Sequence, residues 1–405
     1  DRYKTFQLKN GAEVYGGFPN TGTPSWEDRD WEINETILSG EIGDSGTKTD
    51  NCYHVFYHLV GDEIDESAVL DGFTITGGYA DGSGDHDDGG GMFNDRCSPT
   101  IANCDFVDNY AMTYGGGLYN YDASPTLTSC TFFSNQAKYH CGGLFNDWYS
   151  TPVVTNCTFT GNHGGWDGGG IENRRFSDAV ITNCTFWNNQ ADFGGGIYTE
   201  QSSPLITNCI LWEDIADLSG NEIYISSGTP VITYCDIQGD HPGTGCFSGT
   251  PMWTNPGSGD FHLLSNSPCI DTGTNSAPNL PERDFEGENR IGDGDKDGSA
   301  RVDMGVDEYG VQVGILVDLQ GDNRPPEGWQ VPIDVGFYPP GSPDTWLLNP
   351  ASATYYFSGT SSMVNIVSGT QAYFECPEPV APGTYDITAD SKTTLMNVKK
   401  GVELW

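Results

Sequence analysis

The sequence predicts an all-β protein, in which a parallel β-helix is followed by a small antiparallel β-sandwich. A phrase close to Pro-x-aliphatic-x-Asn-Cys recurs along residues 98–239, and such a repeat indicates a solenoid, because one unit must stack on its neighbours to bury its apolar face. The 54 glycines and the absence of a 3.6-residue period argue against helices between the strands. The cysteines of the six repeats lie 25 to 27 residues apart, at Cys104, Cys130, Cys157, Cys184, Cys209 and Cys235.

Three apolar columns accompany the cysteine column and predict three short strands in each turn. In the first regular repeat they are Ile101, Phe106 and Leu118, the last of them behind a cluster of glycines. Alternate residues of a strand point to opposite sides, so we expect these side chains to face the interior of the solenoid. Roughly nine coils between residues 5 and 240 would make a rod of about 40 Å.

Asparagine recurs at two positions where each coil must bend. Asn tolerates the left-handed backbone conformation of a bend, and its amide can bond to the Asn one coil away. We therefore expect two ladders, the first of Asn103, Asn156, Asn183 and Asn208, and the second of Asn109, Asn135, Asn162 and Asn189.

The twelve cysteines divide into two groups of six. The regular stacking of the inward column favours buried thiols that act as small apolar filler. The others lie off that column, and Cys246 with Cys269 is the pair that we would test first for a disulfide.

Composition changes divide the chain into three parts. Residues 1–262 form the β-helix and begin with irregular coils, and residues 263–310 form an acidic, glycine-rich connecting segment. Residues 311–405 contain strand-like runs separated by Pro and Gly turns, which is typical of a β-sandwich. With the phrase Gly-Thr-Tyr-Asp-Ile-Thr at residues 383–388, this last part resembles the immunoglobulin-like modules of surface proteins.

Several short phrases in the first two parts of the chain, and the order in which they occur, are similar to those of a known family. They are Phe-Gln-Leu-Lys-Asn-Gly at residues 6–11, Leu-Asp-Gly-Phe-Thr-Ile-Thr-Gly-Gly at 70–78, the Asn-Cys-Thr-Phe coils, and Ser-Pro-Cys-Ile-Asp-Thr-Gly at 267–273. Over residues 1–310 the chain resembles the right-handed parallel β-helix repeat proteins of the bacterial cell surface, of the choice-of-anchor type. The resemblance implies an extracellular or cell-surface protein, and that family has no agreed catalytic residues. Its members usually begin with a segment that caps the first coils, which we do not find here, so we expect an open N-terminal end.

The charge of the chain excludes some partners. With 57 acidic and 17 basic residues, it is a poor ligand for nucleic acid. It has no run of 18 apolar residues that would predict insertion into a membrane. Among three Asn-x-Thr sequons, only Asn34 is a credible glycosylation site, because Asn156 and Asn183 belong to a predicted ladder.

The connecting segment contains a candidate calcium loop. Residues 293–299 read Asp-Gly-Asp-Lys-Asp-Gly-Ser, with the carboxylates and the sixth-position glycine of an EF-hand loop. The ending departs from that pattern, because Met304 occupies position 12, and an unoccupied turn is the alternative interpretation. The predicted Ca²⁺ ligands are Asp293, Asp295, Asp297, Ser299 and Asp303.

Evidence for catalysis is sparse. A lyase needs a basic side chain and a hydrolase needs a pair of carboxylates. The regular coils offer Lys138, Arg174 and Arg175 as bases, and the seven histidines show no metal-ligand spacing. The outward acids follow the third strand, where we interpret them as a solvated edge: Asp95, Asp122, Asp147 and Glu200.

An outward aromatic stripe follows the inward aliphatic residues of the third strand. Flat rings on the surface of a rod can stack on sugars or bind another protein, although aromatic residues are also common on ordinary sheets. The stripe consists of Tyr119, Phe145, Tyr198 and Tyr224.

The sequence favours a non-enzymatic structural or adhesive protein. An open β-helix exposes unpaired backbone at its ends, so we expect self-association into a homo-oligomer or a head-to-tail filament. The alternatives are a pectate-lyase-like enzyme that degrades polysaccharides and a carbohydrate-binding protein that uses the aromatic stripe.

Overall fold

The computed structural model describes residues 1–44, 46–292, 294 and 298–309, and six strands of the remaining chain. The chain divides into two compact units, Asp1–Tyr309 and Gly310–Trp405. Within the described residues, no helix is both long enough and apolar enough to cross a membrane.

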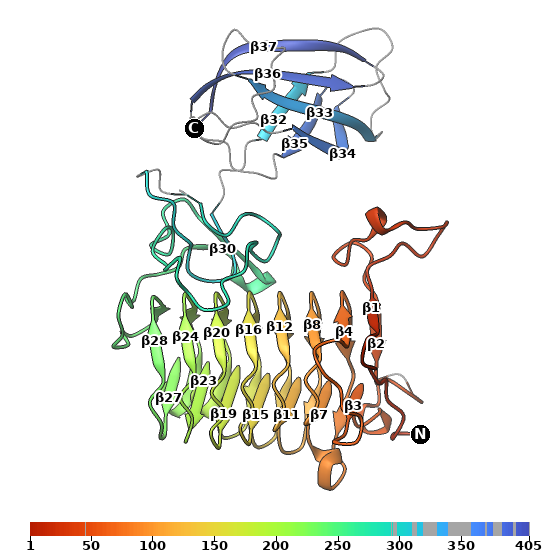
Figure 1. The fold of residues 1–405 in the computed structure, drawn as a ribbon, viewed down its shortest axis with the longest axis vertical. Coiled ribbons are helices and arrows are strands. Elements are labelled where there is room, and N and C mark those ends of the chain that lie inside the picture. The colour runs from red at the N-terminus through yellow and green to blue at the C-terminus, as the bar shows by residue number, and fades with distance from the viewer. Residues whose placement is uncertain are drawn as a thin grey trace. The chain divides into compact units, whose positions relative to one another are not determined.

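The first unit is a right-handed parallel β-solenoid whose strands stack in register from coil to coil (Figure 1). Its strands form four parallel sheets, which are numbered in the order in which the chain visits them. Sheet 1 contains β1 (Glu13–Tyr15), β4 (Val69–Asp71), β8 (Thr100–Ala102), β12 (Thr126–Thr128), β16 (Val153–Thr155), β20 (Val180–Thr182), β24 (Leu205–Thr207) and β28 (Val231–Thr233). Sheet 2 contains β2 (Ile37–Ser39), β5 (Thr74–Thr76), β9 (Asp105–Val107), β13 (Thr131–Phe133), β17 (Thr158–Thr160), β21 (Thr185–Trp187), β25 (Ile210–Trp212) and β29 (Asp236–Ile237).

Sheets 3 and 4 complete each turn. Sheet 3 contains β6 (Tyr79–Ala80), β10 (Tyr110–Ala111), β14 (Gln136–Ala137), β18 (His163–Gly164), β22 (Gln190–Phe193) and β26 (Ile215–Ser219). Sheet 4 contains β3 (Phe56–His58), β7 (Met92–Asp95), β11 (Leu118–Tyr121), β15 (Leu144–Asp147), β19 (Ile171–Arg174), β23 (Ile197–Glu200) and β27 (Ile223–Ile225). The described part of the chain also has short 3-10 turns, η1 (Trp26–Asp28), η2 (Lys48–Asp50), η3 (Gly84–Asp87) and η4 (Pro256–Ser258).

The prediction of a parallel β-helix is confirmed, but the prediction of three strands per turn is wrong. Six turns carry all four strands, and isolated parallel bridges such as Phe6 to Phe56 and Asp236 to Phe247 add partial coils at the two ends. The missed strands are those of sheet 3, several of which are only two residues long. Their buried side chains are small, namely Ala80, Ala111 and Ala137, so they produce no apolar column that the sequence pattern could reveal.

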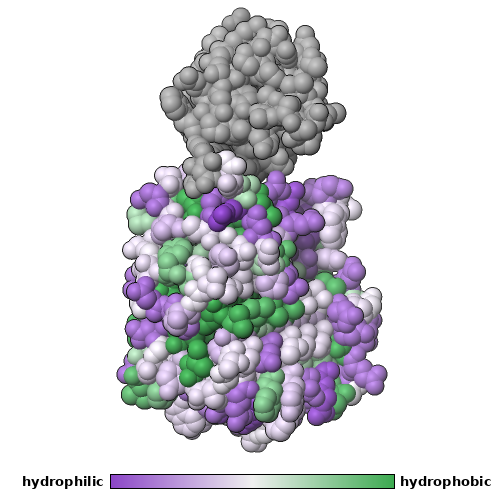
Figure 2. Space-filling view, turned by 60° about the vertical axis from the view of Figure 1, so that its left-hand side comes forward, coloured by the Kyte–Doolittle hydropathy of each residue, from purple (hydrophilic) through white to green (hydrophobic). Residues whose placement is uncertain are grey.

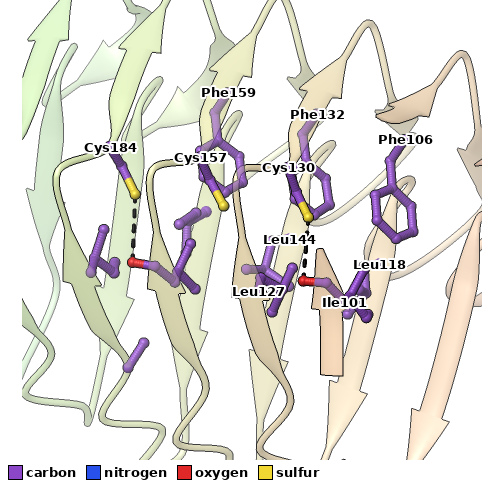
Figure 3. Close-up of a cluster of buried hydrophobic side chains, with 14 of the residues drawn as sticks. Ile101, Phe106, Leu118, Leu127, Cys130, Phe132, Leu144, Cys157, Phe159 and Cys184 are labelled. Atoms are coloured by element: carbon purple, nitrogen blue, oxygen red, sulfur yellow. Dashed lines mark hydrogen bonds between the residues drawn. The ribbon is translucent and has the colours of Figure 1, made fainter. Parts of the chain in front are cut away.

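The core of the solenoid consists of the predicted columns (Figure 3). The phenylalanine rings of neighbouring coils stack with centroids 4.8 Å apart, as for Phe106 on Phe132 and Phe132 on Phe159. All six cysteines of the inward column are buried free thiols, and the thiol of Cys130 donates to the carbonyl oxygen of Ile101 one coil earlier. Since each coil repeats the same contacts, the core is continuous along the solenoid axis.

Buried amide ladders run parallel to this apolar core. In the second predicted ladder, the Asn109 amide donates to Asn135, that of Asn135 to Asn162 and that of Asn162 to Asn189, at 2.9–3.1 Å. The bend itself lies one residue earlier, where residues such as Asp108 have a positive φ. A third ladder, which the sequence analysis missed, joins Asn94, Asn120, Asn146 and Asn173 in sheet 4.

The first predicted ladder bends the chain as expected but bonds differently. Asn103, Asn156, Asn183 and Asn208 all have left-handed backbones, with φ between 48° and 56°. Only Asn208 donates to an Asn one coil away, Asn183, at 3.2 Å. The amides of Asn156 and Asn183 donate instead to carbonyl oxygens of the acidic segment, at Arg283 and Asp303. This ladder therefore docks the acidic segment on the solenoid.

The acidic segment packs against the solenoid within the first unit. The hairpin of β30 (Trp253–Asn255) and β31 (Asp260–Leu263), which leads into this segment, is antiparallel. Leu263, Cys269, Ile270 and Met304 form a second small core with Ile210 of β25. The proposed disulfide between Cys246 and Cys269 is not formed, because Cys246 lies at the end of the cysteine column beside Cys235, whereas Cys269 contacts Asp236.

In the second unit, the described strands form a six-stranded antiparallel sheet in the order β32-β35-β34-β33-β36-β37. They are β32 (Gly314–Asp318), β33 (Gln330–Tyr338), β34 (Ser358–Ser368), β35 (Gln371–Glu375), β36 (Gly383–Ser391) and β37 (Thr394–Leu404). The immunoglobulin-like character of this unit stays a prediction.

Candidate functional site

One side-chain column runs along the outer face of sheet 4 and is aromatic at every position but one. The parallel register aligns the residue that follows the inward aliphatic side chain in each coil. Glu172 of β19 therefore stands where its neighbours have phenyl or phenol rings. The column reads Tyr57, Phe93, Tyr119, Phe145, Glu172, Tyr198 and Tyr224.

The predicted aromatic stripe belongs to this column, but the expectation that its rings are exposed is wrong for three of the four. Tyr119, Phe145 and Tyr198 are buried, and Tyr224 is half-buried. Side chains that precede the strands of sheet 4 pack on the column: the Tyr114 ring lies 5.6 Å from that of Tyr119 and 4.9 Å from that of Phe145, between centroids. These three rings are therefore not available as a flat binding face.

Glu172 is the centre of a polar cluster in this aromatic surface. The Nδ1 atom of His140 lies 3.3 Å from Oδ2 of Asp167 and 3.5 Å from Oε1 of Glu172. The Nη1 atom of Arg174 lies 3.6 Å from the same Oε1, while its Nη2 lies 2.6 Å from Oε2 of Glu200. His140 comes from the turn before β15, and the two residues of β19 come from the next coil, so stacking of coils assembles the cluster.

Burial shifts the protonation of this cluster. It raises the pKa of Glu172 to about 7, although His140 and Arg174 oppose the shift. Burial also opposes the protonation of His140, but the carboxylates of Asp167 and Glu172 outweigh it and raise the pKa of His140 to about 9. Titratable groups perturbed by burial and by specific partners often mark functional sites.

Exposed aromatic side chains lie beside this cluster, at the turn that follows sheet 4. The coils that contain β15 and β19 have one residue more in this turn than the other regular coils, which accounts for their 27-residue spacing. Trp148, Tyr149 and Phe176 occupy these turns and are 43%, 57% and 53% exposed. Their φ angles are 50°, 61° and 68°, a left-handed conformation that bulky residues rarely adopt.

Contacts hold these rings in place. Tyr149 stacks on Phe176 with centroids 5.3 Å apart. The Arg175 guanidinium lies over the Trp148 ring at 5.9 Å, and its Nη1 is 2.7 Å from Oδ2 of Asp147. Backbone strain at exposed aromatic residues is a feature that we interpret as functional.

A further exposed ring, that of Trp166, lies on the other side of the cluster. Trp166 is half-exposed and packs edge-on against His140, with centroids 5.1 Å apart, and also against Tyr139. The Nζ atom of Lys138 lies 5.2 Å from the Tyr139 ring centroid. The cluster and the exposed rings that precede and follow it in adjacent coils thus form a strip across sheet 4. We call it the transverse strip, and it comprises Lys138, Tyr139, His140, Trp148, Tyr149, Trp166, Asp167, Glu172, Arg174, Arg175 and Phe176.

The structure brings the three predicted basic residues, Lys138, Arg174 and Arg175, into this strip. The four outward acids are not simply a solvated edge. Asp147 is buried against Arg175, and Glu200 pairs with Arg174. The other two, Asp95 and Asp122, flank Arg96. Sequence analysis missed His140, Asp167 and Glu172, because the histidine lies about one coil away from both acids in the sequence.

The candidate calcium loop is described only in part. Asp293, Asp295 and Asp297 lie outside the described residues. Ser299 is exposed, and Asp303 is buried with both carboxylate oxygens accepting backbone N–H groups, from Asp271 and from Tyr309, at 2.6 Å. Calcium binding by this loop therefore stays a prediction.

The predicted glycosylation site, Asn34, is half-buried, and its side-chain amide donates to the carbonyl oxygen of Gly17 at 3.3 Å. Glycosylation of Asn34 also stays a prediction.

A cavity of about 430 Å³ lies between the outer face of sheet 2 and the acidic segment. Thr131, Phe133 and Thr158 line one side, and Glu286 and Asp307 line the other. Beside it, Nε2 of His262 lies 3.4 Å from Oε1 of Glu286. Burial raises the pKa of Glu286 to about 7, so this cavity also holds a perturbed acid.

The solenoid defines the class of the protein, a right-handed parallel β-helix. Residues 42–172 and 149–252 match the family model described as the right handed beta helix region. These segments together cover more than half of the chain, which therefore belongs to this family. Comparison with curated proteins finds no match. The β-helix fold is compatible with surface proteins and with polysaccharide-related proteins.

Proposed function

We propose that this protein is an extracellular or cell-surface adhesive protein that binds polysaccharide at the transverse strip. The observation that carries the proposal is that exposed rings lie on both sides of a charged cluster, in adjacent coils. Trp166 lies on one side, and Trp148 and Phe176 lie on the other. Partly exposed aromatic rings offer an apolar face to solvent, so they are suited to stacking on sugar rings.

The polar groups between these rings would bind sugar hydroxyl groups. Arg174, Arg175 and Glu200 are each partly exposed and already held by ion pairs, so their orientation is fixed before a ligand arrives. Such preorganisation reduces the entropy cost of binding. Arg29 also lies over exposed rings, those of Trp26 and Trp31, but in the transverse strip two consecutive arginines stand beside the buried cluster of His140 and Glu172, which supports a site on sheet 4.

Binding to a panel of plant and bacterial polysaccharides tests the proposal. Tryptophan fluorescence titration should show saturable binding, and Trp148→Ala and Trp166→Ala should each weaken it at least about tenfold. Phe133→Ala is the matched control, because this ring is similarly exposed but lies on sheet 2. Binding that survives both tryptophan substitutions would contradict the proposal.

The same experiment separates adhesion from degradation. The fully buried Glu172 and its partner His140 form an acid-base pair, which is the observation that favours an enzyme. Release of new reducing ends or of unsaturated sugars, and its loss in Glu172→Gln, would identify a polysaccharide-degrading enzyme. Binding without product would support the adhesive function.

A second candidate function, end-to-end association, rests on the ends of the solenoid. Exposed apolar residues occur at the C-terminal coil, at Ile215, Leu218, Ile225 and Val231. Figure 2 turns this end forward and shows apolar side chains gathered on that face. The first coils also expose Val14, Ile33 and Ile37, beside the unpaired edges of β1 and β2. Two different apolar ends would associate head to tail and form filaments.

Light scattering across a concentration series tests this association. The wild type should increase in mass with concentration, and the single substitution Leu218→Lys should keep it monomeric. A mass that stays constant in the wild type, or an unchanged assembly in Leu218→Lys, would contradict head-to-tail association.

A further inference from the structure

We propose that His140, Asp167 and Glu172 bind a divalent transition-metal ion of the Zn²⁺ class. One ligand atom from each residue lies within 4.8 Å of the other two. This inference does not depend on polysaccharide binding, because it concerns the chemistry of the three side chains alone.

The distances fit a shared ion. Zn²⁺ bonds of about 2.0–2.2 Å in a tetrahedron place neighbouring ligand atoms roughly 3.3–3.6 Å apart. The Nδ1 atom of His140 is 3.3 Å from Oδ2 of Asp167 and 3.5 Å from Oε1 of Glu172. Both distances are longer than a well-formed N–H to oxygen hydrogen bond, which is about 2.7–3.2 Å.

Two of the three residues, His140 and Glu172, also have candidate ligand atoms with unmet hydrogen-bonding capacity. Nδ1 of His140 and both carboxylate oxygens of Glu172 are buried, and none of the three has a hydrogen-bond partner. Buried charges in proteins are normally paired or coordinate metals. Arg174 compensates Glu172 only weakly, because its Nη1 is 3.6 Å away while its Nη2 and Nε atoms are each 2.6 Å from Glu200. A cation between His140 and the two acids would complete this site.

The second cluster of the described residues, His262 with Glu286 and Asp307, differs in these respects. The side chain of His262 is 43% exposed, and its Nδ1 lies 2.7 Å from Oδ1 of Asp260. Asp307 already accepts the backbone N–H of Leu263. This cluster has the features of a partly hydrated ion pair, and it provides a control from the same chain.

The donor set indicates which metal fits. One imidazole nitrogen and two carboxylate oxygens suit Zn²⁺, Co²⁺ or Mn²⁺, whereas Ca²⁺ prefers six to eight oxygen ligands. Three protein ligands leave at least one coordination position for water or for a ligand oxygen.

Titration of the EDTA-treated full chain with Zn²⁺ and Co²⁺ tests the proposal. We expect one tight equivalent by calorimetry and a Co²⁺ absorption band in the visible region. Glu172→Gln and Asp167→Asn should each weaken binding at least about tenfold and remove the band. His262→Gln should leave both unchanged.

Circular dichroism of each metal-free variant shows whether it has folded. Because Asp167 is partly exposed, its amide variant should fold even if Glu172→Gln does not. Lack of stoichiometric binding by the wild type, or unchanged binding in a folded Asp167→Asn variant, would overturn the proposal. Loss of polysaccharide binding alone would leave it standing, because the Co²⁺ band reports on the metal directly.

Discussion

Asp214 ends the amide ladder by accepting two hydrogen bonds from Asn189, one from its backbone N–H and one from its side-chain amide, each at 2.8 Å. Its carboxyl group also faces the buried carboxyl group of Glu222. Burial raises the pKa of Asp214 to about 7, and burial together with the Asp214 charge raises the pKa of Glu222 to about 10. The pair therefore retains a proton in the folded protein at neutral pH.

This carboxyl pair predicts that the solenoid loses stability as the pH rises. In the unfolded chain both groups titrate near pH 4, whereas in the folded chain their pKa values are raised, so the folded state binds more protons above pH 4. The stabilisation is complete below about pH 4 and decreases as the pH approaches 10, by up to roughly 1.4 kcal/mol per pH unit for one proton. Urea denaturation at several pH values measures it.

Glu222→Gln should flatten this pH dependence, because the amide needs no proton beside the Asp214 carboxylate. Glu213→Gln, at an exposed acid next to Asp214, is the control and should retain the slope of the wild type. Equal slopes in the wild type and in Glu222→Gln would show that this pair does not bind the proton.

The amide ladder predicts a large cost for removing one of its members. The Asn162 amide donates to Asn189 and to the carbonyl oxygen of Phe132, and its Oδ1 accepts from Asn135. Asn162→Ala leaves these buried groups without partners, which should lower the free energy of unfolding by about 3 kcal/mol. Asn188→Asp, at an exposed bend with a φ of 54°, should change it by less than about 0.5 kcal/mol. Chemical denaturation of both variants compares them, and similar losses would argue against the ladder.

The sequence predicts the solenoid well because each coil places the same kinds of side chain at the same inward positions. Cys130, Phe132 and Leu144 occupy one position each in the repeat, and all three are buried where the pattern places them. The strands of sheet 3 were missed because Ala111 and Ala137 are too small to mark an apolar column. Large inward side chains are therefore the part of a coil that the sequence reveals.

The candidate site is less predictable, since it depends on what covers the sheet. Alignment of the repeats could have shown that Glu172 interrupts an aromatic column. It could not have shown that the Tyr114 ring packs on that column, or that Tyr119 is buried while Tyr149 is exposed. The alternation of residues in a strand predicts on which face of the sheet a side chain lies. Whether that side chain is exposed depends on the path of the neighbouring turn.

Cys246, at the end of the thiol column, should be alkylated selectively in the folded protein. Cys246 is partly exposed, and a hydrogen bond with Cys235 lowers the pKa of its thiol to about 7. By contrast, burial raises the pKa of thiols such as Cys157 and Cys184 well above the ordinary value. Against the effect of burial, hydrogen bonds with neighbouring thiols lower the pKa of Cys209, but this residue is fully buried and closed to a reagent. The thiolate is the reactive form, so iodoacetamide at pH 7.5 should modify Cys246 before any other cysteine of the described residues.

Peptide mass spectrometry after brief alkylation identifies the modified cysteines. Alkylation in denaturant is the control and should modify all twelve. If Cys157 reacted in the folded protein as fast as Cys246, the buried column would not be closed to solvent.

The candidate calcium loop predicts an effect of chelation on stability. An antiparallel bridge between Gly292 and Arg301 joins the ends of this loop, and Asp303 anchors the following chain. Ca²⁺ bound by Asp293, Asp295 and Asp297 would stabilise the folded state in proportion to its affinity, by about 2.7 kcal/mol at a hundredfold excess over Kd. The melting temperature should fall with EGTA in the wild type but not in Asp295→Asn. The exposed variant Asp240→Asn should behave like the wild type, and no response to Ca²⁺ in the wild type would favour an unoccupied turn.

The left-handed backbone of Trp148 predicts that a substitution can relieve strain and stabilise the protein while it removes polysaccharide binding. Its φ is 50°, a conformation that costs a bulky residue roughly 1–2 kcal/mol, whereas Asn adopts it readily. The ring is 43% exposed, and its described ring and guanidinium neighbours, Tyr121, Tyr149 and Arg175, lie 5.9–6.3 Å from its centroid, so we expect its loss to remove less stability than the backbone strain costs. Trp148→Asn should therefore unfold at equal or higher denaturant concentration than the wild type while losing polysaccharide binding. Destabilisation by more than about 1 kcal/mol would instead show that Trp148 is retained for packing.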